Sequence, residues 1–319
     1  MIKQPQSKQA ILDNRNFLMG TAMLFVLMYH FTCWIGYRKL LLPFNWGFIG
    51  VDIFLFLSAI GLGISASNRP YKEFIKRRVI RIMPLYIFAA TVDSIFFLFK
   101  EGKNALNLWD WFCNLTSLSY YGAGGYVRDW YLSSLLLLYV IYPVLMLYVN
   151  KCKQGGVGCS LLLSALVVSM IDMPFQYNCF ISRLPIFLFG IFIYYEMSCS
   201  LESQHFTKYA YITSTLGIIT FLYANISNPK LLFISTALLA PIMIILCIKG
   251  IKYIPQNIQH IICYIGKYSL EFYIANLCIH CFLDLTTSIH IKSMIYILGN
   301  VLLALILIPL NRMCRQVLS

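Results

Sequence analysis

Residues 18–34 read LMGTAMLFVLMYHFTCW, an apolar run that contains one histidine, His30. As a helix, about 20 such residues cross the ~30 Å hydrocarbon core of a bilayer. Comparable runs recur along the 319-residue chain, which is 60% apolar and only 12% charged. Soluble globular domains carry about 25% charged residues. The composition therefore predicts an integral membrane protein.

Hydropathy along the chain predicts an all-α, polytopic bundle of about ten transmembrane helices. The predicted spans are residues 17–36, 47–66, 79–99, 130–149, 157–172, 183–197, 208–225, 231–248, 261–283 and 293–311. The breaks between them are polar or contain Gly or Pro, as in SNRPYK and ISNPK. We interpret residues 1–319 as a single transmembrane domain that begins with a cytoplasmic N-terminal segment, residues 1–16.

The distribution of basic residues predicts the orientation of the bundle. If the N-terminus is cytoplasmic, 17 of the 25 Lys and Arg residues fall in cytoplasmic loops and tails. Such an excess is typical of the cytoplasmic side of membrane proteins, so both termini are expected in the cytoplasm. The same bias explains the net charge of +13. We therefore expect membrane lipids as partners and no nucleic acid.

Two ionisable residues lie at similar predicted depths inside the bilayer. Counting outward from residue 17 at ~1.5 Å per residue, His30 lies ~20 Å from the cytoplasmic edge of the hydrocarbon core. Asp52, in the inward-running WGFIGVDIFLFLSAIGLGIS (46–65), lies ~8 Å below the outer edge, almost level with His30. A His–Asp pair has two interpretations. It joins two helices by a hydrogen bond, or Asp52 fixes the tautomer of a general base, His30.

A basic run, YKEFIKRRVIRIMPLY (71–86), precedes the third span. Its Arg78 and Arg81 are three residues apart and share a helical face. One interpretation is an ordinary cytoplasmic cluster that binds anionic lipid. The other is a site for a phosphate group that arrives from the cytosol.

Other polar features are less specific. Trp130 is an interfacial aromatic residue or a ligand contact, and Arg183 opens RLPIFLFGIFIYY from the outer side. Asn276 lies in GKYSLEFYIANLCIH, and residues 100–129 form an ordinary interfacial loop or contact a substrate. The cysteines fall mostly in or beside apolar runs, so neither a disulfide framework nor a metal site is expected.

Six blocks, in the same order, resemble the acyltransferase-3 family of membrane-embedded acyltransferases. Three are the most specific. The first, LMGTAMLFVLMYHF, is similar to a family helix with Arg or Lys, ten residues, then His. The second, WGFIGVDIFLFLSAIGLGIS, is similar to GFxGVDxFFxLSGFL, and the third, FIKRRVIRIMPLY, is similar to a basic motif that ends in proline. The weaker blocks are DWYLSSLLLLYVIYP, RLPIFLFGIFIY and IGKYSLEFYIAN.

This resemblance implies transfer of an acyl group, commonly acetyl, from cytosolic acetyl-CoA to a hydroxyl of a carbohydrate. The acceptor is expected to be a cell-surface polysaccharide or its lipid-linked precursor, and the location a bacterial plasma membrane. His30 matches the essential histidine of the family and Asp52 its second-helix aspartate, so these two are the expected catalytic residues. Arg78 and Arg81 match the basic motif and are expected to bind CoA. The expected substrate-binding residues are Ser58, Trp130, Arg183 and Asn276.

Two positions depart from the family pattern. Met19 stands where the family has Arg or Lys, and Asn276 stands where many relatives have histidine. Arg15 lies four residues before Met19, one helical turn closer to the cytosol, so we expect it to replace the missing cation in binding CoA. The variant Arg15→Ala tests this substitution by its effect on CoA binding.

The preferred mechanism uses His30 as general base, and a variant lets His30 carry the acyl group as a nucleophile. Two other functions stay open at this point. One is a transporter or flippase, although no related halves are evident. The other is a non-catalytic relative that binds acyl-CoA or a glycan.

Overall fold

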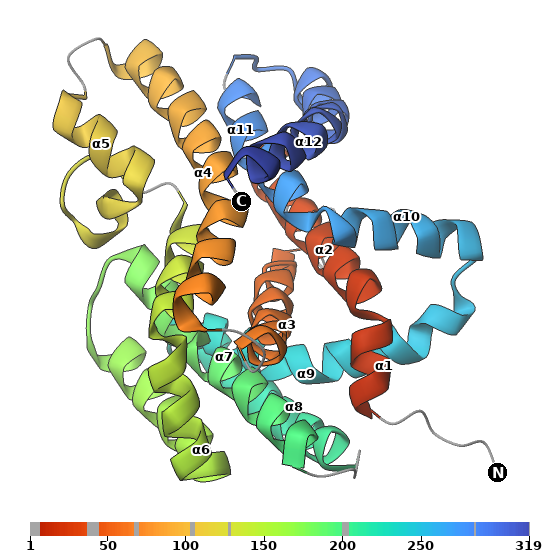
Figure 1. Ribbon diagram of the computed structural model, residues 1–319. Helices are drawn as coiled ribbons and strands as arrows, with labels where there is room; N and C mark the ends of the chain where they lie inside the picture. Colours follow the sequence, from red (N-terminus) through yellow and green to blue (C-terminus); the bar gives the residue numbers. More distant parts are fainter. Residues whose placement is uncertain are drawn as a thin grey trace. The chain divides into compact units, whose positions relative to one another are not determined.

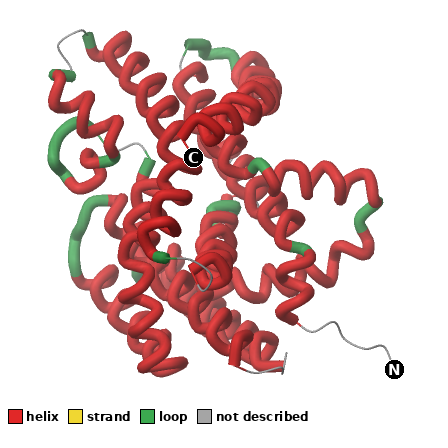
Figure 2. Tube along the Cα trace, viewed as in Figure 1, coloured by secondary structure: helices red, strands yellow, loops and turns green. Residues whose placement is uncertain are grey.

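The computed structural model describes residues 7–36, 45–66, 70–102, 106–126, 129–199, 204–283 and 285–318. These residues form helices joined by short loops, with no strand among them (Figure 2). In chain order the helices are α1 (Ser7–Asp13), α2 (Arg15–Ile35), α3 (Ile49–Ala66), α4 (Tyr71–Glu101), α5 (Leu108–Thr116), η2 (Leu118–Tyr121), α6 (Trp130–Met170), α7 (Phe175–Cys199), α8 (Gln204–Ile226), η3 (Pro229–Leu231), α9 (Leu232–Gly250), η4 (Ile251–Tyr253), α10 (Gln256–Lys267), α11 (Ser269–Leu283) and α12 (Ile289–Leu318) (Figure 1).

Seven helical segments in the described part of the chain are long and apolar enough to cross a membrane: α2, α3, α4, α6, α7, α9 with its flanking 3-10 turns, and α12. Helix α11 is apolar but shorter. The predicted helical membrane protein is therefore confirmed. The orientation of its termini and the total of about ten spans stay predictions.

The break predicted between spans 130–149 and 157–172 is observed: α6 covers residues 130–170, and its helical backbone is interrupted at Lys153 (φ 47°, ψ −136°). Two other spans differ from the observed helices. The predicted span 261–283 begins within α10 and includes all of α11. Helix α8 covers 208–225, but it is not among the described segments that are apolar enough to cross a membrane.

The chain divides into two compact units, and two helices contribute to both. Unit 1 comprises residues 1–29, 43–69 and 141–267. Within it, α3 packs against α7 and α9, and α8 packs along α9. Glycines permit close approach between these helices. A Cβ at Gly50 of α3 would lie 2.2 Å from the backbone oxygen of Ala22, and one at Gly190 of α7 would lie 2.8 Å from that of Phe56. Small residues at such crossings are typical of membrane helices.

Unit 2 comprises residues 30–42, 70–140 and 268–319. In this unit α11 packs against α12 and α4, and α4 also contacts α5 and α12. One side of α12 is covered by exposed apolar residues at helical spacing, among them Met294, Leu298, Val301 and Leu305. An unburied apolar helix face of this kind is suited to contact with lipid tails.

Candidate active site

The ring of His30 belongs to a hydrogen-bonded chain that joins three helices of unit 2. Its Nδ1 donates to Oδ1 of Asn276 on α11, and Nδ2 of Asn276 donates to the hydroxyl of Tyr296 on α12 at 2.7 Å. Asn276 is fully buried and Tyr296 is nearly so. Because a carbonyl oxygen accepts at Nδ1, the proton of the neutral imidazole lies on Nδ1. The Nε2 atom then carries the lone pair and can accept a proton.

Two further aromatic rings surround His30. The indole of Trp34, one turn later on α2, stacks on the imidazole with centroids 4.2 Å apart and an interplanar angle of 9°. The ring of His280 on α11 lies 4.2 Å from the same indole. His30 is half-buried beneath this cover. Trp34 and His280 both line a cavity, so only one indole ring separates His30 from its wall.

This cavity has a volume of about 290 Å³ and lies entirely within unit 2. Polar side chains that line it include Tyr86, Asp93, Asn114, Ser119 and Asp129. Alanine side chains of α4 and Leu277 of α11 supply apolar wall. Hydroxyl, amide and carboxylate groups thus face one space together with aromatic rings. Such a cavity can hold a small hydroxylated ligand.

Asp129 precedes α6 and serves as its N-cap. Its Oδ1 accepts from the backbone N–H groups of Tyr131 and Leu132 and from the hydroxyl of Tyr273, the last at 2.8 Å. Its Oδ2 is buried and has no hydrogen-bond partner among the described residues. Burial raises the pKa of this carboxyl to about 6, against the opposing effect of its hydrogen bonds. An oxygen of Asp129 therefore retains its capacity to accept a hydrogen bond from a ligand.

Local hydrogen bonds shape the segment between α4 and α6 that lines the cavity. Asn107 and Asp110 form a capping box at the start of α5, and Asp110 also accepts from the backbone N–H of Gly125 at 2.7 Å. Asn114 accepts from the N–H of Tyr126 and donates to Ser94 of α4. Gly125 has φ +68°, and a Cβ there would lie 2.2 Å from the amide oxygen of Asn114. The turn therefore requires glycine.

The basic motif lies on the N-terminal half of α4. Arg78 and Arg81 are half-buried, and the guanidinium of Arg78 lies within 6 Å of the ring centroids of Phe74 and Tyr139. Arg77, by contrast, is exposed and pairs with Glu73 on its own helix. The structure therefore separates the two motif arginines from their exposed neighbour, as their spacing predicts. Binding of CoA by these arginines stays a prediction.

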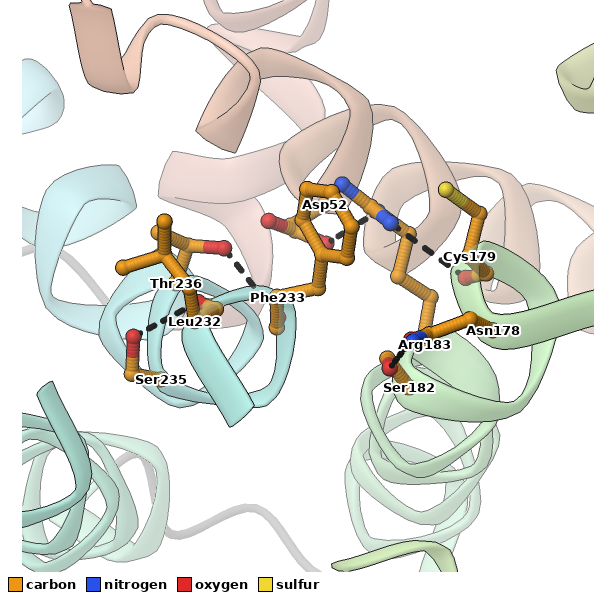
Figure 3. Close-up of polar contacts among 9 residues, drawn as sticks. All are labelled: Asp52, Asn178, Cys179, Ser182, Arg183, Leu232, Phe233, Ser235 and Thr236. Carbon is orange, nitrogen blue, oxygen red and sulfur yellow. Dashed lines mark hydrogen bonds and ion pairs between the residues drawn. The ribbon is translucent and has the colours of Figure 1, made fainter. Parts of the chain in front are cut away.

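Asp52 has its ionic partner in unit 1. Oδ1 of Asp52 on α3 lies 3.0 Å from Nε of Arg183 on α7, and both side chains are buried (Figure 3). Arg183 also donates to the backbone oxygen of Cys179, and its guanidinium lies 4.6 Å from the ring centroid of Phe233 on α9. These contacts place Arg183 between helices of unit 1, and its expected contact with a substrate stays a prediction. Because Asp52 and His30 belong to different units, the pairing expected between them stays a prediction.

The other predicted site residues occupy varied places. Arg15 begins α2, where its Nη2 atom would lie 3.7 Å from a Cβ at Gly61, and Met19 is buried. Ser58 is half-buried on α3. Trp130 is the first residue of α6 and packs edge-on against Tyr131. Asn276, expected to bind substrate, holds His30.

The sequence analysis missed two acidic residues of the cavity. Asp93 lies in the apolar half of α4, and Cys281 of α11 donates its thiol to the Asp93 carboxylate at 3.4 Å. The same rule that selected Asp52, an ionisable group within an apolar run, would have selected Asp93. Asp129 carries a weaker signal, as an N-cap residue before a long apolar helix.

We compared the chain with curated proteins, with solved structures and with models of protein families. No curated protein and no solved structure matches. A family model described as an acyltransferase domain matches residues 16–310, which is nearly the whole chain. The match includes the His30 helix, the basic motif and every helix that lines the cavity. The chain therefore belongs to the acyltransferase-3 family of membrane acyltransferases.

Proposed function

We propose that this membrane acyltransferase moves an acetyl group from cytosolic acetyl-CoA to a hydroxyl of a carbohydrate, such as a cell-surface polysaccharide or its lipid-linked precursor, in a bacterial plasma membrane. The observation that carries the proposal is the geometry around His30. Asn276 accepts from Nδ1, which leaves Nε2 as a base beside a polar cavity. A neutral imidazole held in one tautomer is suited to remove a proton from a hydroxyl.

In the proposed reaction, Nε2 of His30 removes the proton of the acceptor hydroxyl as its oxygen attacks the thioester carbon. The tetrahedral intermediate then collapses, and the carbon–sulfur bond breaks. The imidazolium returns the proton to the departing sulfur, so the products are an acetyl ester and free CoA. Asn276 acts as a positioning residue, because its amide oxygen fixes the tautomer and orientation of the ring.

The acyl donor is proposed to bind along α4. Arg78 and Arg81 lie in its N-terminal half, and the cavity residues Tyr86, Ala89 and Asp93 follow on the same helix. Guanidinium groups bind phosphate oxygens through charge-assisted hydrogen bonds. CoA phosphates at the arginines would therefore allow the pantetheine arm to extend toward the cavity.

The decisive experiment is a transfer assay with the full-length protein in lipid nanodiscs. Radiolabelled acetyl-CoA is supplied with a panel of glycosides, and the label in the glycoside and the free CoA are both measured. We expect equal amounts of acetyl ester and CoA. Binding of acetyl-CoA without transfer to any acceptor would indicate a non-catalytic relative, and no binding would contradict the proposal.

The same preparation separates two forms of the mechanism. If His30 is a general base, the protein carries no label after incubation with acetyl-CoA alone. If His30 is a nucleophile, labelled acetyl-histidine accumulates without acceptor and disappears when acceptor is added.

A further inference from the structure

The cavity carries two carboxylates that the proposed chemistry does not use. Asp93 comes from α4, and Asp129 comes from the N-cap of α6. Asp93 accepts from a thiol, and Oδ1 of Asp129 accepts from a tyrosine hydroxyl and two backbone N–H groups. Each aspartate is therefore anchored from outside the cavity while it lines the inside. Anchored acceptors of this kind impose a fixed orientation on a ligand.

The remaining polar wall adds hydrogen-bonding groups and little positive charge. It includes the amide of Asn114 and the hydroxyls of Tyr86 and Ser119, with His280 as a titratable group. The described residues that line this cavity include no lysine or arginine. The two aspartates thus make the described lining of this cavity acidic.

We propose that this cavity is the acceptor site and that Asp93 and Asp129 make it selective for an uncharged, hydroxyl-rich sugar over a sugar that carries a carboxylate at the same place. This proposal rests on the proposed transfer of an acetyl group to a carbohydrate. It adds that the carbohydrate acceptor is uncharged at the position that meets the two aspartates. The free Oδ2 of Asp129 accepts from one sugar hydroxyl, and Asp93 accepts from another. The ring of Trp34, which covers His30, bounds the sugar on the catalytic side.

The charges of the two aspartates determine how strongly the cavity should prefer a neutral sugar over an anionic one. A hydroxyl donates to a carboxylate in a strong, charge-assisted hydrogen bond. A third carboxylate in the same cavity repels the other two, and such a like-charge contact weakens binding. An anionic sugar should therefore bind roughly 100-fold more weakly than its neutral isostere.

The test uses three methyl glycosides that differ at one carbon: the glucoside, the glucuronamide and the glucuronate. The amide is the neutral isostere of the carboxylate, so it separates charge from the loss of the C6 hydroxyl. Binding to the protein in nanodiscs is followed by tryptophan fluorescence, and Trp34→Phe identifies the part of the signal that comes from the cavity. Transfer from labelled acetyl-CoA is measured with the same ligands, and the galactose and mannose series are run in parallel.

We expect the two neutral glycosides to bind and the glucuronate to bind roughly 100-fold more weakly. Asp129→Asn keeps a good N-cap residue and should lower this preference about tenfold. Asp93→Asn should act in the same direction. The control is Asp172→Asn, which removes an exposed carboxylate that pairs with Lys230 and should leave the preference unchanged.

Equal binding of the amide and the carboxylate to the wild-type protein would overturn the proposal. So would a preference that survives both cavity substitutions, or the absence of a Trp34-dependent signal with every neutral glycoside. Transfer without the charge preference would disprove the selectivity and leave the proposed function standing. A charge preference in binding with no transfer to any acceptor would disprove the proposed function and leave the sugar site standing.

Discussion

Both units contain a buried polar contact between helices that are apolar elsewhere, but the two contacts have different partners. In unit 1 the carboxylate of Asp52 pairs with Arg183, and the ring of Phe233 covers the guanidinium. In unit 2 the imidazole of His30 pairs with the neutral Asn276 and adjoins a polar cavity through Trp34. The first arrangement joins two opposite charges, although neither Asp52 oxygen meets hydrogen-bond geometry with a partner among the described residues. The second joins a histidine to a neutral amide next to a cavity wall.

The difference shows how a buried ionisable residue in a membrane helix can be assigned a role. Charges inside a bilayer core are costly, so each one is first a functional candidate. A charge that is neutralised by an opposite charge and enclosed by packing mainly joins helices. A histidine that is hydrogen-bonded to a neutral amide and packed against a residue of a cavity wall fits the catalytic role proposed here. Partner and access therefore separate the two roles better than depth in the membrane does.

The largest expected effect is the loss of activity in His30→Ala. Removing a general base costs roughly 10²- to 10⁴-fold in rate. The measurement is acetyl transfer in nanodiscs, with binding of acetyl-CoA as a check that the protein is folded. His290→Ala, at an exposed position near the start of α12, is the matched control and should keep wild-type activity. Wild-type transfer by His30→Ala would contradict the assignment.

Breaking the ion pair of unit 1 should mainly affect stability. Asp52→Leu leaves the buried Arg183 without its partner, which should lower the free energy of unfolding by about 3 kcal/mol or more. The double variant Asp52→Leu, Arg183→Met should recover most of the loss, because it removes both charges. Thermal unfolding in detergent measures both. If Asp52 instead supports the imidazolium of His30, the double variant will be folded and inactive in transfer.

Asn276 offers a smaller effect with a distinctive pH signature. Asn276→Ala removes the acceptor at Nδ1 of His30 and should lower kcat about 10- to 100-fold, with less effect on the KM of the acceptor. Asn276→Asp places a carboxylate there and stabilises the imidazolium. Its transfer activity should therefore rise at a higher pH than that of the wild type. An unchanged pH profile in Asn276→Asp would show that Asn276 only packs the helices.

Acidification should weaken the selectivity of the cavity. Burial raises the pKa of Asp129 to about 6, so this carboxyl is charged above that pH and neutral below it. The preference for a neutral over an anionic glycoside should be full at pH 7.5 and several-fold smaller at pH 5. The groups that face Asp129 are Tyr86, Asp93, Tyr131, Tyr273 and His280. Asp129→Asn should therefore reduce the pH dependence of this preference.

We expect the smallest effect on stability and activity from breaking an exposed ion pair, which serves as a comparison for the buried pair of Asp52 and Arg183. Asp172 and Lys230 pair at 2.8 Å, and this contact lowers the pKa of Asp172. Exposed pairs contribute little, because solvent screens them and long side chains lose freedom. Lys230→Met should leave both the thermal midpoint and acetyl transfer unchanged within error. A clear loss of stability would mean that exposure does not distinguish this pair from Asp52–Arg183.

Much of the architecture could be predicted from the sequence, because hydropathy and positive charge follow directly from composition. The same information pointed to His30 and to Arg78 and Arg81. Pairing could not be predicted, since it depends on which helix faces meet. The structure pairs Asp52 with Arg183, a contact that the sequence did not predict, while the roles expected of both residues stay predictions. The interruption of α6 at Lys153, by contrast, falls in the polar segment 150–156 where the sequence predicted a break between two spans.

Asn276 illustrates a second limit of sequence reasoning. Its position in a family block suggested a functional residue, and its polar amide in an apolar run suggested a ligand contact. The structure places that amide between His30 and Tyr296, a pair of hydrogen bonds that the sequence did not predict, and its contact with a ligand stays a prediction. Asp93 and Asp129 lie far apart in the sequence, so the cavity they share depends on the tertiary structure.

The basic motif and the cavity residue Asp93 lie on one helix, so α4 fixes the distance between them. Twelve residues separate Arg81 from Asp93, a rise of about 18 Å. If the arginines hold the CoA phosphates, the enzyme measures the length of its acyl donor, because a shorter thioester cannot engage both ends. Acetyl thioesters truncated to N-acetylcysteamine should therefore be poor donors even at high concentration. One extra helical turn inserted between Arg81 and Asp93 should then favour a donor with a longer arm.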